Sequence, residues 1–323
     1  MKALNFFTAL IAASFIPTAV FAQAALEPCG TITRNTTLKS DCAAPLIVGA
    51  DNIKIDLNGF GVRSNDASID EYIVLENRHG VTITNGKLEG ELPNYTDSCY
   101  HCIQITGGYS NRVTNMVLQV GEEGIGVRVV NSKRNLIRNV KIVGSSANKG
   151  VSIIDSDKNI IDHLTNEGGL DTGAYIAGSH NLFKRSVIRT VQLVDTPVSV
   201  TVARGRGNII DNNVISCSSS IPGILILGAS SDTTVRSNTI NACTTAIDTQ
   251  APRTIIKGNR VTNSSEVGIQ VASLENTIRS NTVENSGTVD MLDFNPNCGT
   301  NDWKNNSFST DSEGDGPRAG CIR

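Results

Sequence analysis

The hydrophobic positions of this chain recur in one short pattern between residues 53 and 308. A hydrophobic residue is followed three positions later by Asn or a small residue, and two positions further on by another hydrophobic residue. The clearest copies superimpose without a gap and span residues 208–215, 233–240, 254–261 and 276–283. Looser copies begin at Ile53, Val81, Asn111, Asn135, Asn159, Asn181 and Asn301, mostly 21 to 30 residues apart. A repeat of this length predicts a solenoid.

Each repeat contains alternating hydrophobic residues, such as Ile210 and Ile215, and then a short strand that begins with glycine, such as residues 223–226 or 268–271. Alternation with β-branched residues predicts strands. Three strands fill a unit of this length and leave no room for a helix, which excludes leucine-rich and helical repeats. The sequence therefore predicts an all-β fold, a single-stranded parallel β-helix solenoid of about eleven coils.

Asparagine occupies one position in five consecutive repeats, at Asn213, Asn238, Asn259, Asn281 and Asn306. Stacked coils lie about 4.8 Å apart, so these amides are expected to form a ladder in which each bonds the backbone and the next amide. Because buried polar groups at a tight bend need partners, we interpret these residues as structural.

Composition narrows the partners and the compartment. The chain has 323 residues, 39% of them hydrophobic and 18% charged, with a net charge of −3 and no basic run. We therefore expect one domain with a long core, and neither nucleic acid nor an anionic membrane as partner.

The first 22 residues have the pattern of a secretory signal: Lys2, an apolar stretch to Phe21, and small residues at the two positions that a signal peptidase recognises before Gln23. We expect a signal peptide at 1–22, an N-terminal cap at 23–52, the β-helix at 53–308 and a C-terminal cap at 309–323. No later stretch is long and apolar enough to cross a bilayer, so a secreted or periplasmic protein is expected.

Eight cysteines in an exported chain indicate disulfides. Cys217 and Cys243 follow ladder residues at nearly equal offsets, which places them on neighbouring coils within bridging distance. Cys29 with Cys42 would link the beginning of the chain, and Cys298 with Cys321 its end. The remaining pair, Cys99 and Cys102, falls in one loop, where a disulfide is favoured over a redox or metal motif because no second pair has zinc spacing.

Several segments together resemble a known group of proteins. They are Cys29–Thr33, Val48–Gly59, the repeated Asn-x-Ile-x-x-Asn-x-Ile, and Asn297–Trp303. The chain resembles the bacterial exported right-handed parallel β-helix proteins of the pectate-lyase-like superfamily, including the NosD-like periplasmic group, over about residues 29 to 323. The resemblance implies a right-handed solenoid but no single reaction, because members of this superfamily differ in function. The motifs of polygalacturonases and pectate lyases and the calcium-binding glycine repeat are missing.

In such folds the ligand usually binds at the strand that begins with glycine. With Ile103, Val127, Val151, Ala174, Val200, Ile224, Ile247 and Ile269 pointing inward, the outward neighbours are Gln104, Arg128, Ser152, Tyr175, Thr201, Leu225, Asp248 and Gln270. The preceding loops add Tyr100, His101, Glu122, Glu123, Lys149, Asp171 and Asp195. The outward residues and these loops are expected to line a groove.

Three kinds of chemistry fit these residues. A lyase or epimerase acting on a uronate needs a base and a cation for the enolate, for which Lys149 or Tyr175 and Arg128 are the candidates. A hydrolase needs two carboxylates about 5–9.5 Å apart, for which Glu122 and Asp171 are the candidate pair. A glycan-binding surface would use His101, Gln104, Tyr100 and Ser152, and aromatic rings such as those of Tyr72, Tyr95, Tyr100 and Tyr109 often contact sugars. Packing of the loop against the coil explains the same tyrosines.

No cofactor is expected. The four histidines, His79, His101, His163 and His180, do not share a ligand spacing, so no copper or zinc site is predicted, and calcium is unsupported. Trp303 falls at an inward position and is expected to close the last coil.

Two functional hypotheses remain. The first is a protein that binds or modifies an extended polysaccharide along one solenoid face, a lyase or epimerase being favoured over a glycoside hydrolase if it is an enzyme. The alternative is a noncatalytic exported scaffold or adhesin. The oligomeric state stays open, with Leu225 and Leu227 as a hypothetical apolar subunit contact.

Overall fold

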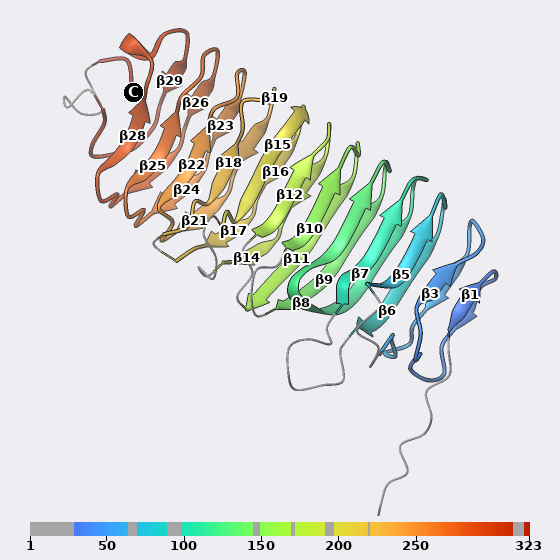
Figure 1. Ribbon diagram of the computed structural model, residues 1–323. Helices are drawn as coiled ribbons and strands as arrows, with labels where there is room; N and C mark the ends of the chain where they lie inside the picture. Colours follow the sequence, from blue (N-terminus) through green and yellow to red (C-terminus); the bar gives the residue numbers. More distant parts are fainter. Residues whose placement is uncertain are drawn as a thin grey trace, which may run out of the picture.

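The structure is a computed structural model that describes residues 29–63, 70–88, 99–144, 149–168, 172–190, 197–218, 220–312 and 320–323. The expected signal peptide at 1–22 lies outside the described residues. Consecutive coils stack into one elongated solenoid that runs from the N-terminal to the C-terminal end of the chain (Figure 1). Among the described residues, no helix is long and apolar enough to cross a membrane.

The strands form three parallel columns, which we call sheets A, B and C. Sheet A contains β1 (Gly30–Ile32), β3 (Leu46–Val48), β5 (Glu71–Glu76), β7 (Cys99–Thr106), the end of β8 (Arg112–Val130), β10 (Lys149–Ile154), β12 (Thr172–Ala177), β15 (Val200–Arg206), β18 (Ile224–Ile226), β22 (Thr245–Thr249), β25 (Val267–Val271) and β28 (Val289–Asp293).

Sheet B contains β2 (Thr36–Thr37), β4 (Lys54–Asp56), β6 (Thr82–Leu88), the beginning of β8, β9 (Leu136–Gly144), β11 (Ile160–Gly168), β13 (Leu182–Lys184), β16 (Ile209–Asp211), β20 (Thr234–Arg236), β23 (Ile255–Lys257), β26 (Thr277–Arg279) and β29 (Asp302–Lys304). Sheet C continues from the later parts of β6, β8, β9 and β11 into β14 (Val187–Arg189), β17 (Val214–Ser216), β21 (Thr239–Asn241), β24 (Arg260–Thr262) and β27 (Thr282–Glu284). The short β19 (Ser230–Ser231) pairs with β15, and a 3₁₀ turn, η1, spans Pro296–Cys298.

The predicted all-β, right-handed parallel β-helix is confirmed, although the number of coils differs slightly from the eleven expected. The predicted inward positions of sheet A are in register from Ile103 to Ile269, and all of them are buried. Trp303 is also buried, as its inward position predicted.

The asparagine ladder is confirmed. The amide of Asn213 donates to Oδ1 of Asn238 over 2.9 Å, Asn238 donates to Asn259 over 3.0 Å, and Asn259 donates to Asn281 over 2.9 Å. A second ladder, which the sequence analysis did not predict, runs through Asn111, Asn135, Asn159, Asn181 and Asn208 at the start of the sheet B strands. The sequence contained a signal for it, because four looser repeats and the first clear repeat begin at these same residues.

The four predicted disulfides are present: Cys29–Cys42, Cys99–Cys102, Cys217–Cys243 and Cys298–Cys321. One detail of the prediction is wrong, because Cys99 and Cys102 lie within strand β7 rather than in a loop. The strand pairs with β8 immediately after the segment 89–98, which lies outside the described residues.

A buried carboxylate on sheet B organises three cationic or basic side chains. Asp162, whose side chain is 2% exposed, is 3.0 Å from Nε of Arg138 and 2.8 Å from Nδ1 of His163, and it also accepts bonds from Arg185. Burial alone would raise the pKa of Asp162, but the hydrogen bonds and charge of Arg185, with the nearby charges of His163 and Lys184, lower the pKa below its usual value. The carboxylate therefore stays ionised and joins three consecutive coils.

We expect Asp162→Asn to lower the free energy of unfolding at neutral pH by about 1–3 kcal/mol, a range reduced because the cationic partners are partly exposed. Since the folded pKa is depressed, the stabilisation is fully present above the unfolded pKa of about 4 and is lost as the pH falls through the folded value. Urea unfolding of both proteins between neutral and acidic pH measures this. A stability difference that does not shrink in acid would contradict the assignment.

Candidate functional site

The outward side of sheet A carries one continuous row of side chains, which we call the sheet A row. The strand register places on it, from coil to coil, Val74, Gln104, Arg128, Ser152, Tyr175, Thr201, Leu225, Asp248, Gln270 and Leu292. The outward positions predicted from the sequence are therefore in register. Arg128 and Tyr175 lie two coils apart with Ser152 between them, which corresponds to about 10 Å.

Three polar side chains at the N-terminal end of this row are linked by hydrogen bonds. Nη1 of Arg128 donates to Oε1 of Gln104 over 3.3 Å, and Nε2 of Gln104 donates to Oγ1 of Thr106 over 2.9 Å. These bonds orient the amide and hold the guanidinium against the sheet. Among the described residues the other guanidinium donors have no acceptor, and a guanidinium is suited to bind hydroxyl or carboxylate oxygens.

Lys149 and Tyr175 form the aromatic part of the site. Lys149 is at the beginning of β10 and Tyr175 is on β12, the next coil, and the ammonium lies 5.4 Å from the centre of the ring. This is the range of a cation–π contact. Ser152, between Arg128 and Tyr175 in the row, is buried, so a ligand would meet the longer side chains of its neighbours rather than the Ser152 hydroxyl.

His101 lies at the edge of the same cluster, at the start of β7. Its Nδ1 is 3.7 Å from Glu71 and its ring centre is 4.6 Å from that of Tyr100, which is 45% exposed. Burial lowers the pKa of His101, the charge of Arg128 lowers it further, and Glu71 acts in the opposite direction. The imidazole is therefore neutral at neutral pH and has both a donor and an acceptor nitrogen.

The structure brings together His101, Gln104, Arg128, Lys149, Ser152 and Tyr175 on neighbouring coils, with Tyr100 beside His101. Asp171 and Asp195 lie outside the described residues, as do the side chains of Glu122 and Glu123, so the carboxylate pair considered for hydrolysis stays a prediction. Glu71 was missed. It stands two residues before Ile73 as His101 stands two before Ile103, so the repeat alignment could have found it.

A second polar group lies farther along the row, at Asp248. Its Oδ2 accepts a hydrogen bond from Nε2 of Gln250 over 3.1 Å, while Oδ1 is buried without a partner among the described residues. Burial raises the pKa of Asp248, although bonds from Gln250 and Gln270 act in the opposite direction. Sequence reasoning placed Asp248 in the row but gave it no role.

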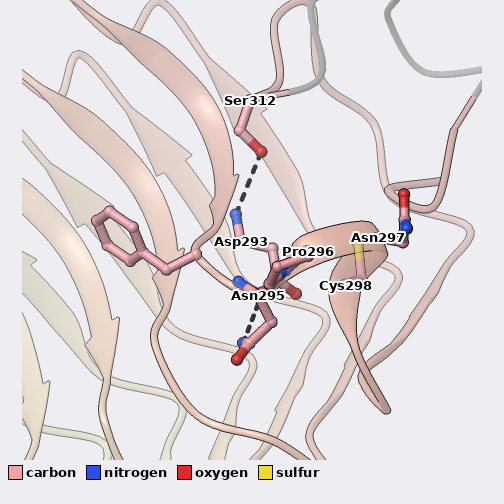
Figure 2. Close-up of a pocket in the computed structure, with 7 residues that line it drawn as sticks. Asp293, Asn295, Pro296, Asn297, Cys298 and Ser312 are labelled. Atoms are coloured by element: carbon pink, nitrogen blue, oxygen red, sulfur yellow. Dashed lines mark hydrogen bonds between the residues drawn. The ribbon is translucent and has the colours of Figure 1, made fainter.

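An open pocket of about 280 Å³ lies at the C-terminal end of the solenoid (Figure 2). It is lined by Asp293, Phe294, Asn295, Pro296, Asn297, Cys298 and Ser312. The Asp293 carboxylate accepts four hydrogen bonds, two from Asn295, one from Asn301 and one from Nε1 of Trp303. Since its carboxylate is fully used in closing the last coil, we interpret the pocket as structural.

Comparison with known proteins supports the same architecture. Residues 126–315 match the family described as "Periplasmic copper-binding protein (NosD)". No curated protein sequence matches this chain.

Among solved structures, the chain is similar to the N-terminal fragment of the bacteriophage Phi29 gene product 12, with 12% identity, a TM-score of 0.52, and 90% of this chain and 68% of that chain covered. It is similar to the catalytic domain of a GH87 alpha-1,3-glucanase in complex with nigerose, with 14% identity, a TM-score of 0.50, and coverage of 88% and 64%. The Dettilon tailspike protein gives 12% identity, a TM-score of 0.48, and coverage of 78% and 58%. The chain thus spans 58% to 68% of the length of these structures, and at such identities the likeness concerns the fold alone.

Proposed function

This chain belongs to the NosD family of periplasmic β-helix proteins, and from that premise we propose that it is an exported protein that binds an extended polysaccharide along the sheet A row. The observation that carries the proposal is the cluster of Gln104, Arg128, Lys149 and Tyr175 on consecutive coils. The cluster combines an exposed edge of donors with an aromatic ring, the combination that contacts the hydroxyls and the apolar face of a sugar.

The shape of the surface supports a chain-like ligand. The row repeats at about 4.8 Å per coil over ten coils in register. A long solenoid presents the same kind of surface over many coils, so an extended ligand gains contacts coil by coil. The neighbour crystallised with nigerose is a glucanase, and the fold is therefore compatible with a carbohydrate ligand.

The description of the family names copper, and the side chains of this chain can be compared with those that copper requires. Copper prefers Cys, Met and His. All eight cysteines are in disulfides, and within the described part of the chain no three His, Cys, Asp or Glu side chains converge on one point. Met116 and Met291 are buried in the core. The described residues do not fit a copper site, and no copper chemistry is derived for this chain.

The same cluster contains the groups that catalysis would require. A lyase or epimerase would use Lys149 or Tyr175 as the base and Arg128 to hold the developing negative charge. Neutral His101, 3.7 Å from Glu71, adds a further group able to take up a proton at this place. Binding is the proposal that the arrangement supports best, and proton abstraction from a uronate remains a hypothesis that depends on it.

The test is a binding screen of residues 23–323 on acidic and neutral polysaccharides, with unsaturated-product absorbance and reducing ends recorded in parallel. For the polysaccharide that binds, we expect Arg128→Ala and Tyr175→Ala each to weaken binding tenfold or more. Arg112→Ala is the matched control, because Arg112 is exposed on the same strand β8 but on sheet B.

Equal loss in Arg112→Ala, or unchanged binding in both sheet A variants, would refute the proposed face. No binding to any glycan would favour the alternative, a noncatalytic exported scaffold. Product absorbance that disappears with Arg128→Ala would extend the proposal to a lyase.

A further inference from the structure

A second row of charged side chains runs along the outward side of sheet B, and we call it the sheet B row. Its members are in register on eight consecutive coils: Arg138, Asp162, Lys184, Asp211, Arg236, Lys257, Arg279 and Lys304. No member of the sheet A row belongs to it. The two rows lie on different faces of the solenoid.

The first half of the sheet B row alternates in sign. Asp162 is bonded to Arg138, and Asp211 lies 2.9 Å from Nε of Arg236. Lys184 stands between the two carboxylates in the register. Opposite charges on neighbouring strands attract one another, so this half needs no ligand to be stable.

The second half abandons this alternation. Arg236, Lys257, Arg279 and Lys304 are four cations on four consecutive coils, β20, β23, β26 and β29, and the last three of these strands end the sheet at its C-terminal end (Figure 1). Like charges directly opposite on adjacent strands destabilise a sheet. The stacked cations are therefore unfavourable for the stability of the fold. The first half of the same row shows the favourable arrangement, in which the charges alternate in sign.

Neighbouring carboxylates neutralise only the ends of this group. Arg236 is paired with Asp211, and Lys304 lies 2.9 Å from Asp302. The central pair, Lys257 and Arg279, has no carboxylate partner in the portion of the chain that the structure describes, and Arg279 is exposed. Positive charge thus remains at the centre of the row although the whole chain carries a net charge of −3.

We propose that Arg236, Lys257, Arg279 and Lys304 form a docking surface for an acidic polysaccharide that lies parallel to the solenoid axis. A linear chain with regularly spaced carboxylates or sulfates would neutralise the stacked cations, which a single small anion reaching one or two coils would not. Binding of such a polyanion would explain why four cations are stacked at a place where they do not stabilise the fold.

The neighbouring outward row of the same strands argues against single-stranded nucleic acid as the occupant. It consists of Thr234, Ile255, Thr277 and Asp302, without an aromatic residue on which bases could stack.

The decisive variant is Lys257→Glu, which restores alternation between Arg236 and Arg279. We expect polygalacturonate binding, measured by calorimetry at low salt, to weaken tenfold or more, while the melting temperature stays the same or rises because the repulsion is removed. Lys184→Ala is the matched control: it removes a cation from the same row, where carboxylates already flank it, and should leave binding unchanged.

Salt and competitor complete the test. Binding should weaken steadily as sodium chloride is raised, since the contact is between exposed charges. The inference is overturned if Lys257→Glu binds polygalacturonate as wild type does, if Lys184→Ala loses as much affinity, or if single-stranded DNA binds equally well. The titration is repeated in the Arg128→Ala background, where polygalacturonate held by the sheet A row no longer contributes, so failure of the sheet A proposal and failure of this one can be distinguished.

Discussion

Replacing Asn238 with alanine is expected to lower the free energy of unfolding by about 2–6 kcal/mol, a large part of the stability of a typical domain. Oδ1 of Asn238 accepts bonds from the backbone N–H and the side-chain amide of Asn213, and its Nδ2 donates to the carbonyl of Ile210 and to Asn259. Alanine removes the acceptor of the Asn213 backbone N–H and of one side-chain N–H of the same buried residue, at about 1–3 kcal/mol each.

Urea unfolding followed by circular dichroism measures this effect. Thr239→Ala is the control, because Thr239 is adjacent in sequence, exposed, and has no side-chain hydrogen bond among the described residues. Its effect should stay within about 0.5 kcal/mol. Similar midpoints for the two variants would show that the asparagine ladder does not stabilise the stack.

The second large effect is expected for Phe183→Ala. Phe183 is fully buried on β13, in register with Ile161 of the preceding coil and Ile210 of the next. Alanine would leave a cavity on the solenoid axis, and such substitutions lower the free energy of unfolding by about 3–5 kcal/mol.

The comparison for this variant is Leu182→Ala, since Leu182 lies next to it but on the outward side and is only half-buried. We expect a clearly smaller loss there. An unfolding midpoint of Phe183→Ala equal to that of Leu182→Ala would mean that the inward and outward sides of sheet B have been assigned wrongly.

The strand register of the solenoid could be predicted because every repeat shows the same alternation of inward and outward positions. Ile224, Ile247 and Ile269 each follow a small residue and alternate with an outward neighbour, so alignment of the repeats gives the strand pairing directly. The same alignment located the cysteines on neighbouring coils. These features depend on sequence position within a repeat, which a single sequence contains in many copies.

Contacts that occur once were not predictable in this way. Asn166 occupies an inward position beside Ile142, where the repeat predicts a hydrophobic residue, and both polar atoms of its amide are buried without partners among the described residues. Gly150 leaves the space for it, because a Cβ there would lie 2.8 Å from Oδ1 of Asn166. An asparagine at a position where the repeat predicts a hydrophobic residue is an exception to the pattern. A single sequence does not indicate how such an exception is accommodated.

The candidate site could be predicted only in part, because some of its contacts also occur only once in the chain. The row from Gln104 to Tyr175 follows from register alone, but the contact of Lys149 with the Tyr175 ring and the position of Glu71 near His101 depend on side-chain conformation and on loops of unequal length. The charge row of sheet B was overlooked because its members are separated by 21 to 27 residues and form no run in the sequence.

The most direct test of polysaccharide binding on sheet A is hydroxyl-radical footprinting of the protein with and without the best-binding polysaccharide. We expect protection of Tyr175 and Tyr100, and no change at Val214, which is 46% exposed on sheet C. Protection at Val214 with Tyr175 and Tyr100 still fully reactive would rule out binding on sheet A, because the ligand would then lie on another face of the solenoid.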